Sequence, residues 1–274
     1  SHAAIGGAAS AALDLSRLAE LPAPIVIEQV MASQIPEVQQ LRAKLIAAAR
    51  LDAAKSVLVR PTTLAGLSKW RVPLKYATRP SHMNQLGAAE WEQFGLSQGD
   101  GNAGFLLTAE LPRPAAAAAM TRDEALTNRV VAQLWELAGW APLERRGWSL
   151  RNTNPTLDGD DGAWLGTGWL VRAIVDAVEF LPADKVPAAL RAALTDRMLG
   201  ELKLMQRDWQ TKRPWYVSAE AVQSNQWILP NEAMVRACLF LGRGRSDPAY
   251  ELGVQNLLRS LDYQGAQGEF VEGL

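Results

Sequence analysis

The sequence predicts an all-α protein, organised as an incomplete (α/α) toroid or barrel of helical hairpins. Apolar residues recur at helical spacing through most of residues 121–274, and the loops between these segments differ in length. No segment shows a convincing alternation of apolar and polar residues. The helices are strongly apolar, as expected where each packs on two neighbours, and neither coiled-coil heptads nor a fixed repeat length is visible.

The first half of the chain gives weaker signals. Residues 24–30, PIVIEQV, are the best candidate for a strand. A helix is predicted over residues 35–59, because Pro36 suits a first turn, Leu41 and Leu45 share a face, and Pro61 ends the pattern. Residues 61–119 are rich in Gly, Pro, Ser and Asn, so we expect loops there, with one short helix near residues 85–94.

Five helices are predicted after residue 120. The first has Thr121 as its expected N-cap, with Glu124 completing a capping box. The others are expected within residues 161–181, 186–209, 229–242 and 247–263, three of them opened by Pro187, Pro230 and Pro248. Residues 1–120 are therefore interpreted as N-terminal helices and loops of the same toroid, and residues 121–274 as its core.

Composition narrows the range of functions. The net charge is −1 and no dense Lys/Arg stripe is present, so nucleic acid is not an expected partner. No apolar run reaches the roughly 20 residues of a membrane span, and no signal peptide is visible. The single cysteine, Cys238, lies among apolar residues and is expected to be buried. The sequence has two histidines and no HExxH or CxxC motif, so we expect no metal site and no other cofactor. Without a GxSxG motif, a Ser-His-Asp triad built on His82 is not expected either.

Tryptophan, arginine and amide side chains gather in three regions at helix ends: residues 145–164, residues 207–220, and residues 218–242 with their polar cluster at 223–227. Indole faces stack on sugar rings, amides pair with hydroxyls, and arginine binds carboxylates through two parallel hydrogen bonds. The sequence therefore predicts a carbohydrate-binding surface at one end of the helices. Its candidate residues are Trp148, Arg151, Asn152, Asn154, Trp164, Arg213, Trp215 and Trp227, whereas Trp135, Trp140 and Trp169 are expected in the core.

Two of these regions also have simpler interpretations. The stretch DGDDG, residues 158–162, lacks the spaced ligands of a calcium loop and fits a solvated turn in which Asp161 caps a helix. Ser224 or Asn225 could likewise cap the helix that follows.

The C-terminal half carries a resemblance to a known class of enzyme. The motif SNQW at residues 224–227, Pro230, a helix ending LFLG, and GEFVEG at residues 268–273 resemble the α/α-toroid domain of polysaccharide lyases. The similar families are the heparinase II/III-like, alginate, and chondroitin/hyaluronate lyases. The resemblance implies β-elimination on an acidic, uronic-acid-containing polysaccharide, without a cofactor, in the periplasm or outside the cell. It also implies that Asn225 binds the substrate carboxylate and stabilises its developing negative charge.

The chain departs from the family pattern in its candidate catalytic residues. Gln226 stands where many relatives have histidine, and the family's tyrosine would fall beyond Leu274. Tyr216 and Tyr263 are the nearest tyrosines, so the catalytic candidates are Asn225, Gln226 and Tyr216. The family also carries a β-sandwich after the toroid, so a missing C-terminal part of the same polypeptide is an expected partner.

Two alternatives remain open from the residues. A glycoside hydrolase needs two carboxyl groups about 5–10 Å apart, which Asp160 or Asp161 with Glu220 or Glu232 could supply. A non-catalytic, carbohydrate-binding or protein-binding helical scaffold needs no base at all.

Overall fold

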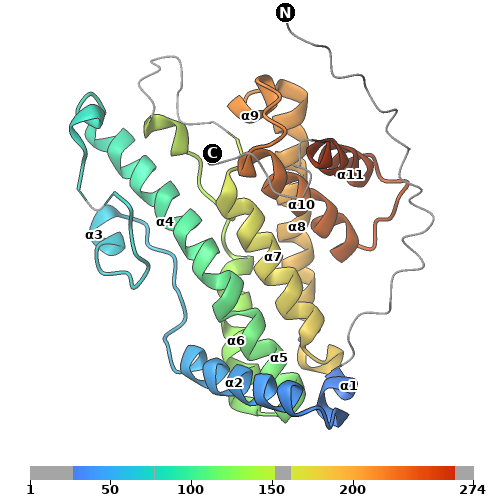
Figure 1. Cartoon of the computed structure of the whole chain (residues 1–274). Coiled ribbons are helices and arrows are strands. Elements are labelled where there is room, and N and C mark those ends of the chain that lie inside the picture. Colours follow the sequence, from blue (N-terminus) through green and yellow to red (C-terminus); the bar gives the residue numbers. More distant parts are fainter. Residues whose placement is uncertain (1–26, 77, 152–161, 263–274) are drawn as a thin grey trace, which may run out of the picture.

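The computed structural model describes residues 27–76, 78–151 and 162–262, and all regular structure within them is helical (Figure 1). The predicted all-α class is therefore confirmed for this part of the chain. The α-helices are α1 (Ile27–Ala32), α2 (Pro36–Ala53), α3 (Leu64–Leu67), α4 (Ala88–Glu110), α5 (Pro112–Thr121), α6 (Glu124–Ala138), α7 (Leu165–Phe180), α8 (Ala188–Thr211), α9 (Trp215–Ser218), α10 (Asn225–Phe240) and α11 (Pro248–Leu261). Three short 3₁₀ helices join them: η2 (Ser81–Met83), η3 (Trp148–Arg151) and η4 (Ala183–Lys185).

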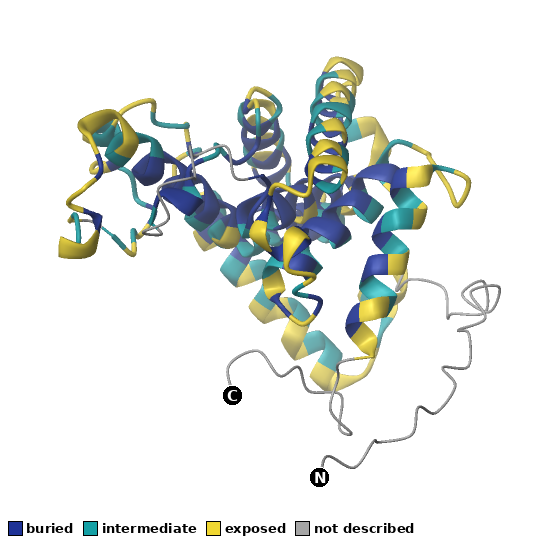
Figure 2. Ribbon diagram, turned by 90° about the horizontal axis from the view of Figure 1, so that it is seen from above, coloured by how far each residue is buried: buried dark blue, intermediate teal, exposed yellow. Residues whose placement is uncertain are grey.

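Helix α7 lies at the centre of the molecule, with α4 on one side and α10 on the other (Figure 1). Helix α11 packs on α10, while α5, α6 and α8 contact these helices or one another. Seen from above, buried residues fill the space between the helices and exposed residues cover the outside (Figure 2). Leu170 and Ile174 of α7 are fully buried in the main core with Leu134 and Met234, because each apolar helix face meets several neighbours.

Glycines allow α4 and α7 to approach closely. A Cβ atom added at Gly166 would come within 2.6 Å of the Cα of Gly101, and one added at Gly104 within 3.1 Å of the Gly166 carbonyl oxygen. Side chains at these positions would push the two helices apart. The contact fixes the N-terminal end of α7 against the middle of α4.

The prediction of loops was wrong for residues 95–119, because α4 and α5 occupy 88–110 and 112–121, whereas the described residues between 61 and 87 hold only the short α3 and η2. Most of the small and polar residues that resembled a loop are buried in α4, and two of the polar side chains have tertiary partners. Gln98 accepts a 2.8 Å hydrogen bond from the backbone N–H of Tyr76, and Asp100 binds two arginines. The strand proposed at residues 24–30 was also wrong where it is described, since Ile27 begins α1.

Two helix starts also differ from the prediction. Asp123, rather than Thr121, caps α6, and its carboxylate accepts hydrogen bonds from Ala125 and Leu126. Helix α10 begins at Asn225 instead of Pro230, so the proline lies inside the helix. Pro230 has no N–H to donate to the carbonyl of Gln226, four residues earlier.

The single cysteine is buried in the main core as predicted. Burial raises the pKa of the Cys238 thiol to about 11, which keeps it protonated near neutral pH. Within the described residues, none of the helices combines the length and apolar character that crossing a membrane requires.

Candidate functional site

A cavity of about 180 Å³ lies where the middle of α4, the 3₁₀ helix η3 and the N-terminal ends of α7 and α10 meet. We call it the aromatic cavity. This volume is below the roughly 300–1,000 Å³ of pockets for drug-sized ligands, so it suits one small polar unit. The lining residues are Lys75, Gly101, Asn102, Glu144, Trp148, Arg151, Trp164, Leu165, Gly166, Trp169 and Gln226.

Two indoles and a guanidinium form one wall of the aromatic cavity. Trp148 and Trp164 have ring centroids 6.2 Å apart and an interplanar angle of 36°. The guanidinium carbon of Arg151 lies 5.2 Å from the ring centre of Trp148 and 5.6 Å from that of Trp164. The wall therefore combines apolar ring faces with a positive charge, a pairing that cation–π attraction stabilises.

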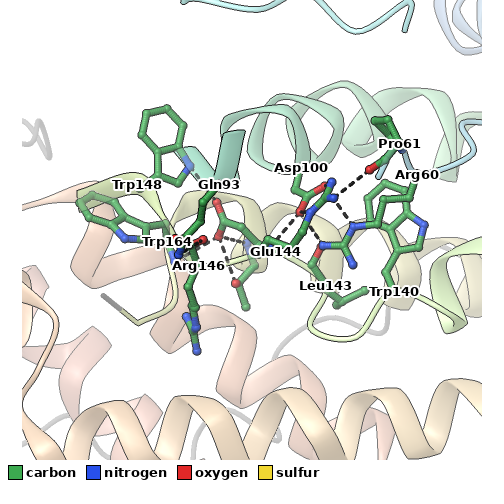
Figure 3. A network of polar contacts seen from close by, with 12 residues as sticks. Arg60, Pro61, Gln93, Asp100, Trp140, Leu143, Glu144, Arg146, Trp148 and Trp164 are labelled. Carbon is green, nitrogen blue, oxygen red and sulfur yellow. Dashed lines mark hydrogen bonds and ion pairs between the residues drawn. The ribbon is translucent and has the colours of Figure 1, made fainter. Parts of the chain in front are cut away.

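The carboxyl group of Glu144 lies between this wall and a second cluster of polar residues (Figure 3). Its Oε2 accepts hydrogen bonds from the backbone N–H of Trp164 at 3.1 Å, and from the N–H and hydroxyl of Thr167 at 2.9 and 3.1 Å. Its Oε1 accepts one from Nε1 of Trp148 at 3.1 Å. The carboxyl thus satisfies N–H groups at the start of α7, where the helix dipole also favours a negative charge.

Burial nevertheless raises the pKa of Glu144 to about 7, although its bonds to Thr167 oppose the shift. Three donors occupy Oε2, so a proton on this carboxyl belongs on Oε1. Oε1 lies beside Gly101 and Gly166, and a Cβ at these positions would come within 3.2 and 2.6 Å of it. Glu144 is therefore a group that both holds and releases a proton near neutral pH, next to the space that the glycines leave.

Other buried carboxylates hold the loop that carries Glu144. The backbone N–H of Leu143 donates to Glu201 at 2.8 Å, and that of Arg145 donates to Asp100 at 2.9 Å. Asp100 is fully buried and binds the guanidinium group of Arg60 (Figure 3). It also binds the guanidinium group of Arg145. A charge buried in this way is stable only with such partners, so the network fixes the loop and with it the position of Glu144.

A short loop before α4, held by side chains of that helix, adds another residue to the cavity lining. The side chain of Asn102 donates to the carbonyl of Pro73 at 2.7 Å, and Gln98 accepts from the N–H of Tyr76 at 2.8 Å. Between these two anchors lies Lys75, which lines the cavity and is exposed. A second cation is thereby placed near the mouth of the aromatic cavity.

Four residues singled out from the sequence line the aromatic cavity: Trp148, Arg151, Trp164 and Gln226. Tyr216 lies behind the wall. It is 1% exposed, its hydroxyl donates to the carbonyl of Ala163 at 2.7 Å, and its ring meets Trp164 edge-on. Tyr216 thus supports the start of α7 and does not line the cavity.

The other predicted residues lie elsewhere. Asn225 is the exposed first residue of α10 and does not line the cavity, and Ser224 is the N-cap, with its Oγ 3.1 Å from the N–H of Trp227. Trp227, expected at a binding surface, is 1% exposed and donates to the carbonyl of Asn256, because its ring fills the space between α8 and α11.

Arg213 and Trp215 are exposed near the start of α9, away from the cavity lining. Neither described carboxylate of the hydrolase interpretation lines it: Glu220 pairs with Arg259 at 3.2 Å, and Glu232 with Arg236 at 2.7 Å. The remaining sequence predictions fall on residues outside the described part of the chain, namely Asn152, Asn154, Asp160, Asp161, Tyr263 and residues 267–273.

Sequence reasoning missed Glu144, Lys75 and Asn102, and it assigned Trp169 to the core. Glu144 directly precedes the polar cluster of residues 145–164, but nothing local indicates that it is buried. Of the three tryptophans expected in the core, Trp140 is buried, Trp169 lines the cavity and Trp135 is 44% exposed.

Within the described ranges, no group of three or more His, Cys, Asp or Glu residues is arranged to hold a metal ion. No protein-family model, no curated protein and no solved structure matches this chain. The function is therefore inferred from the geometry of the aromatic cavity.

Proposed function

We propose that the protein is a polysaccharide lyase that holds one uronic-acid unit in the aromatic cavity and cleaves the chain beside it by β-elimination. The observation that carries this proposal is the buried carboxyl of Glu144, with a pKa of about 7, in a cavity walled by tryptophan and rimmed by cations. This combination offers a base, an apolar ring surface and a counter-charge within one small volume.

The lining suits an acidic sugar. The faces of Trp148 and Trp164 provide an apolar surface for the C–H groups of a pyranose ring. Arg151 supplies two parallel N–H donors to a carboxylate, and Lys75 adds a second positive charge. Gln226, rather than Asn225, is the amide of the SNQW motif that lines the cavity, so we assign the binding of the substrate carboxylate to Gln226.

The reaction follows from these positions. Arg151 and Gln226 bind the uronate carboxylate and stabilise the additional negative charge that develops as the C5–H bond breaks. Ionised Glu144 accepts the C5 proton on Oε1. The C4–C5 double bond forms, the C4–O4 bond breaks, and O4 leaves with the electron pair and takes the proton from Glu144. The products are an unsaturated uronate and a new chain end.

The pH dependence follows from the pKa of Glu144. The base works only when ionised, so kcat/KM for a uronate polymer should rise as the pH passes through about 7.

We also propose the toroid architecture suggested by the sequence. Helices α4, α7 and α10 form a continuous row, and α6 and α8 contact each other, which supports an inner and an outer layer. The cavity lies at one end of the inner row, where the loops of such a fold gather. Since acidic polysaccharides are extracellular polymers, a periplasmic or secreted location accompanies this proposal.

The test is the ultraviolet absorbance of the unsaturated product, measured on alginate, hyaluronan, chondroitin, heparan and glucuronan at pH 6–9. Glu144→Gln should lower kcat by about 10²–10⁴ on the polymer that wild type cleaves, because the amide cannot accept the proton. Glu179→Gln is the matched control, since Glu179 is exposed on α7 and lies outside the cavity.

Three outcomes would overturn the proposal. Reducing ends without ultraviolet absorbance would show hydrolysis. Saturable binding of a polymer without any product would show a carbohydrate-binding scaffold. Full activity of a folded Glu144→Gln variant would remove Glu144 as the base.

A further inference from the structure

We propose that a second sugar-binding subsite adjoins the aromatic cavity on the solvent-exposed face shared by α4 and α7, formed by Phe105, Trp169 and Arg172. It would hold the acidic sugar unit next to the one in the cavity. The subsite rests on the proposed function, and it adds the direction in which the polysaccharide leaves the cavity.

Phe105 is a large apolar side chain that is exposed to solvent, so packing in the core does not account for it. It is 64% exposed, although α4 buries most of the residues around it. It follows the cavity residues Gly101 and Asn102 by four and three positions, which places all three on one side of the helix. Its ring centroid is 5.2 Å from that of Trp169, at an interplanar angle of 64°. Because Trp169 also lines the cavity, the two rings continue its aromatic surface outward.

Arg172 supplies a charge at the far end of this aromatic pair. It lies three residues beyond Trp169 on α7, so the two side chains share a face. The side chain is 47% exposed, and its Nε lies 3.8 Å from the carboxylate of Asp176, beyond hydrogen-bond distance. Asp176 meanwhile accepts a 2.7 Å bond from Arg236. A sugar carboxylate could therefore bind Arg172 without breaking a close ion pair of that residue.

Phe105 and Arg172 lie further along α4 and α7, respectively, than the residues of these helices that line the cavity. Helices α4 and α7 lie side by side and run in the same direction (Figure 1), as the approach of Gly101 to Gly166 and of Gly104 to Leu170 also shows. From Gly166 to Arg172 the axis of α7 advances about 9 Å. Trp169 and Arg172 thus place an aromatic ring and a cation next to each other outside the cavity, as Trp148 and Arg151 do inside it.

The test is the equilibrium affinity for mannuronate, guluronate, galacturonate and glucuronate, each as oligomers of one to four units. Tryptophan fluorescence or calorimetry at pH 5 measures binding while Glu144 holds its proton, so the oligomers stay intact. For the sugar that wild type binds, affinity should rise about three- to tenfold from one unit to two or three. Phe105→Ala and Arg172→Gln should each remove most of that rise and keep the affinity for the single unit. Phe180→Ala is the matched control, because Phe180 is also exposed but ends α7 far from the cavity.

The outcomes separate the subsite from the proposed function. If affinity rises with length equally in wild type and in both variants, the subsite is refuted and the cavity stands. If either variant weakens binding of the single unit as much as that of the longer oligomers, the residue acts on the cavity and the subsite is refuted. If wild type binds none of the oligomers, the proposed function and the subsite both fail.

Discussion

Replacing Glu144 by glutamine should change how the stability of the protein depends on pH. In wild type the carboxyl is buried and its pKa lies at about 7, against an ordinary value of 4.5. Below pH 4.5 the group is protonated whether the protein is folded or unfolded, and its burial costs least. Between pH 4.5 and 7 the unfolded chain releases the proton while the folded protein keeps it, so stability falls as the pH rises. The difference between the two pKa values corresponds to about 3 kcal/mol.

Glutamine has no proton to lose, so the variant should lack this part of the pH dependence. Its amide oxygen can still accept the bonds of Trp164 and Thr167, but its NH₂ group would face Nε1–H of Trp148, which costs about 1 kcal/mol. Glu144→Gln should therefore match wild type to within a few tenths of a kcal/mol at pH 5, where wild type has already lost about 0.8 kcal/mol, and should be about 2 kcal/mol more stable at pH 8.

Urea denaturation at half-unit pH intervals from 5 to 8.5 measures both free energies of unfolding. Taking the difference between the two proteins removes the contributions of other titrating groups, such as Glu201, whose pKa burial also raises. Glu179→Gln, the same change at an exposed position on α7, should follow wild type throughout. Parallel curves for wild type and Glu144→Gln would show that the carboxyl is not held protonated by its surroundings.

Three further changes test the framework around the site, each by urea or thermal denaturation. Ser224→Ala should cost about 1 kcal/mol, because Ser224 caps α10, whereas Asn225→Ala should cost less than 0.5 kcal/mol; the reverse order would make Asn225 the cap. Gly166→Ala should cost about 1–3 kcal/mol, since its Cβ would come within 2.6 Å of Gly101, and an unchanged melting temperature would contradict the close contact of α4 and α7. Asp100→Asn should cost about 3–5 kcal/mol by leaving two arginines without their buried counter-charge, and a loss below 1 kcal/mol would show that the network is not structural.

The sequence determined the helical class of the protein and part of the cavity. Helical spacing, proline at first turns and Gly242 after α10 are local signals, and most helices of residues 121–262 were predicted from them. Trp148, Arg151 and Trp164 were recognised together because they fall within one polar loop region, and neighbours in a loop tend to share a surface.

Only the tertiary structure decided the burial of polar residues. Helix α4 carries Gly, Ser, Gln and Asp where a loop was expected. These residues are tolerated in a buried helix because Asp100 pairs with two arginines and Gln98 accepts a hydrogen bond from the backbone of Tyr76. Trp227 belongs to a polar cluster in the sequence, but its ring is buried between α8 and α11, two helices that are distant in the sequence and close in space.

Glu144 shows most clearly what a local sequence pattern cannot predict, namely the burial and the pKa of a single carboxyl group. Two arginines, Arg145 and Arg146, follow it directly in the sequence, which would suggest an exposed carboxylate. Its pKa is raised by the loss of solvent on folding, and the hydrogen bonds from Thr167, 23 residues away, and the charge of Arg146 oppose that shift. The energy of a charge depends on the three-dimensional distribution of water and dipoles around it, and a local sequence pattern does not contain that distribution.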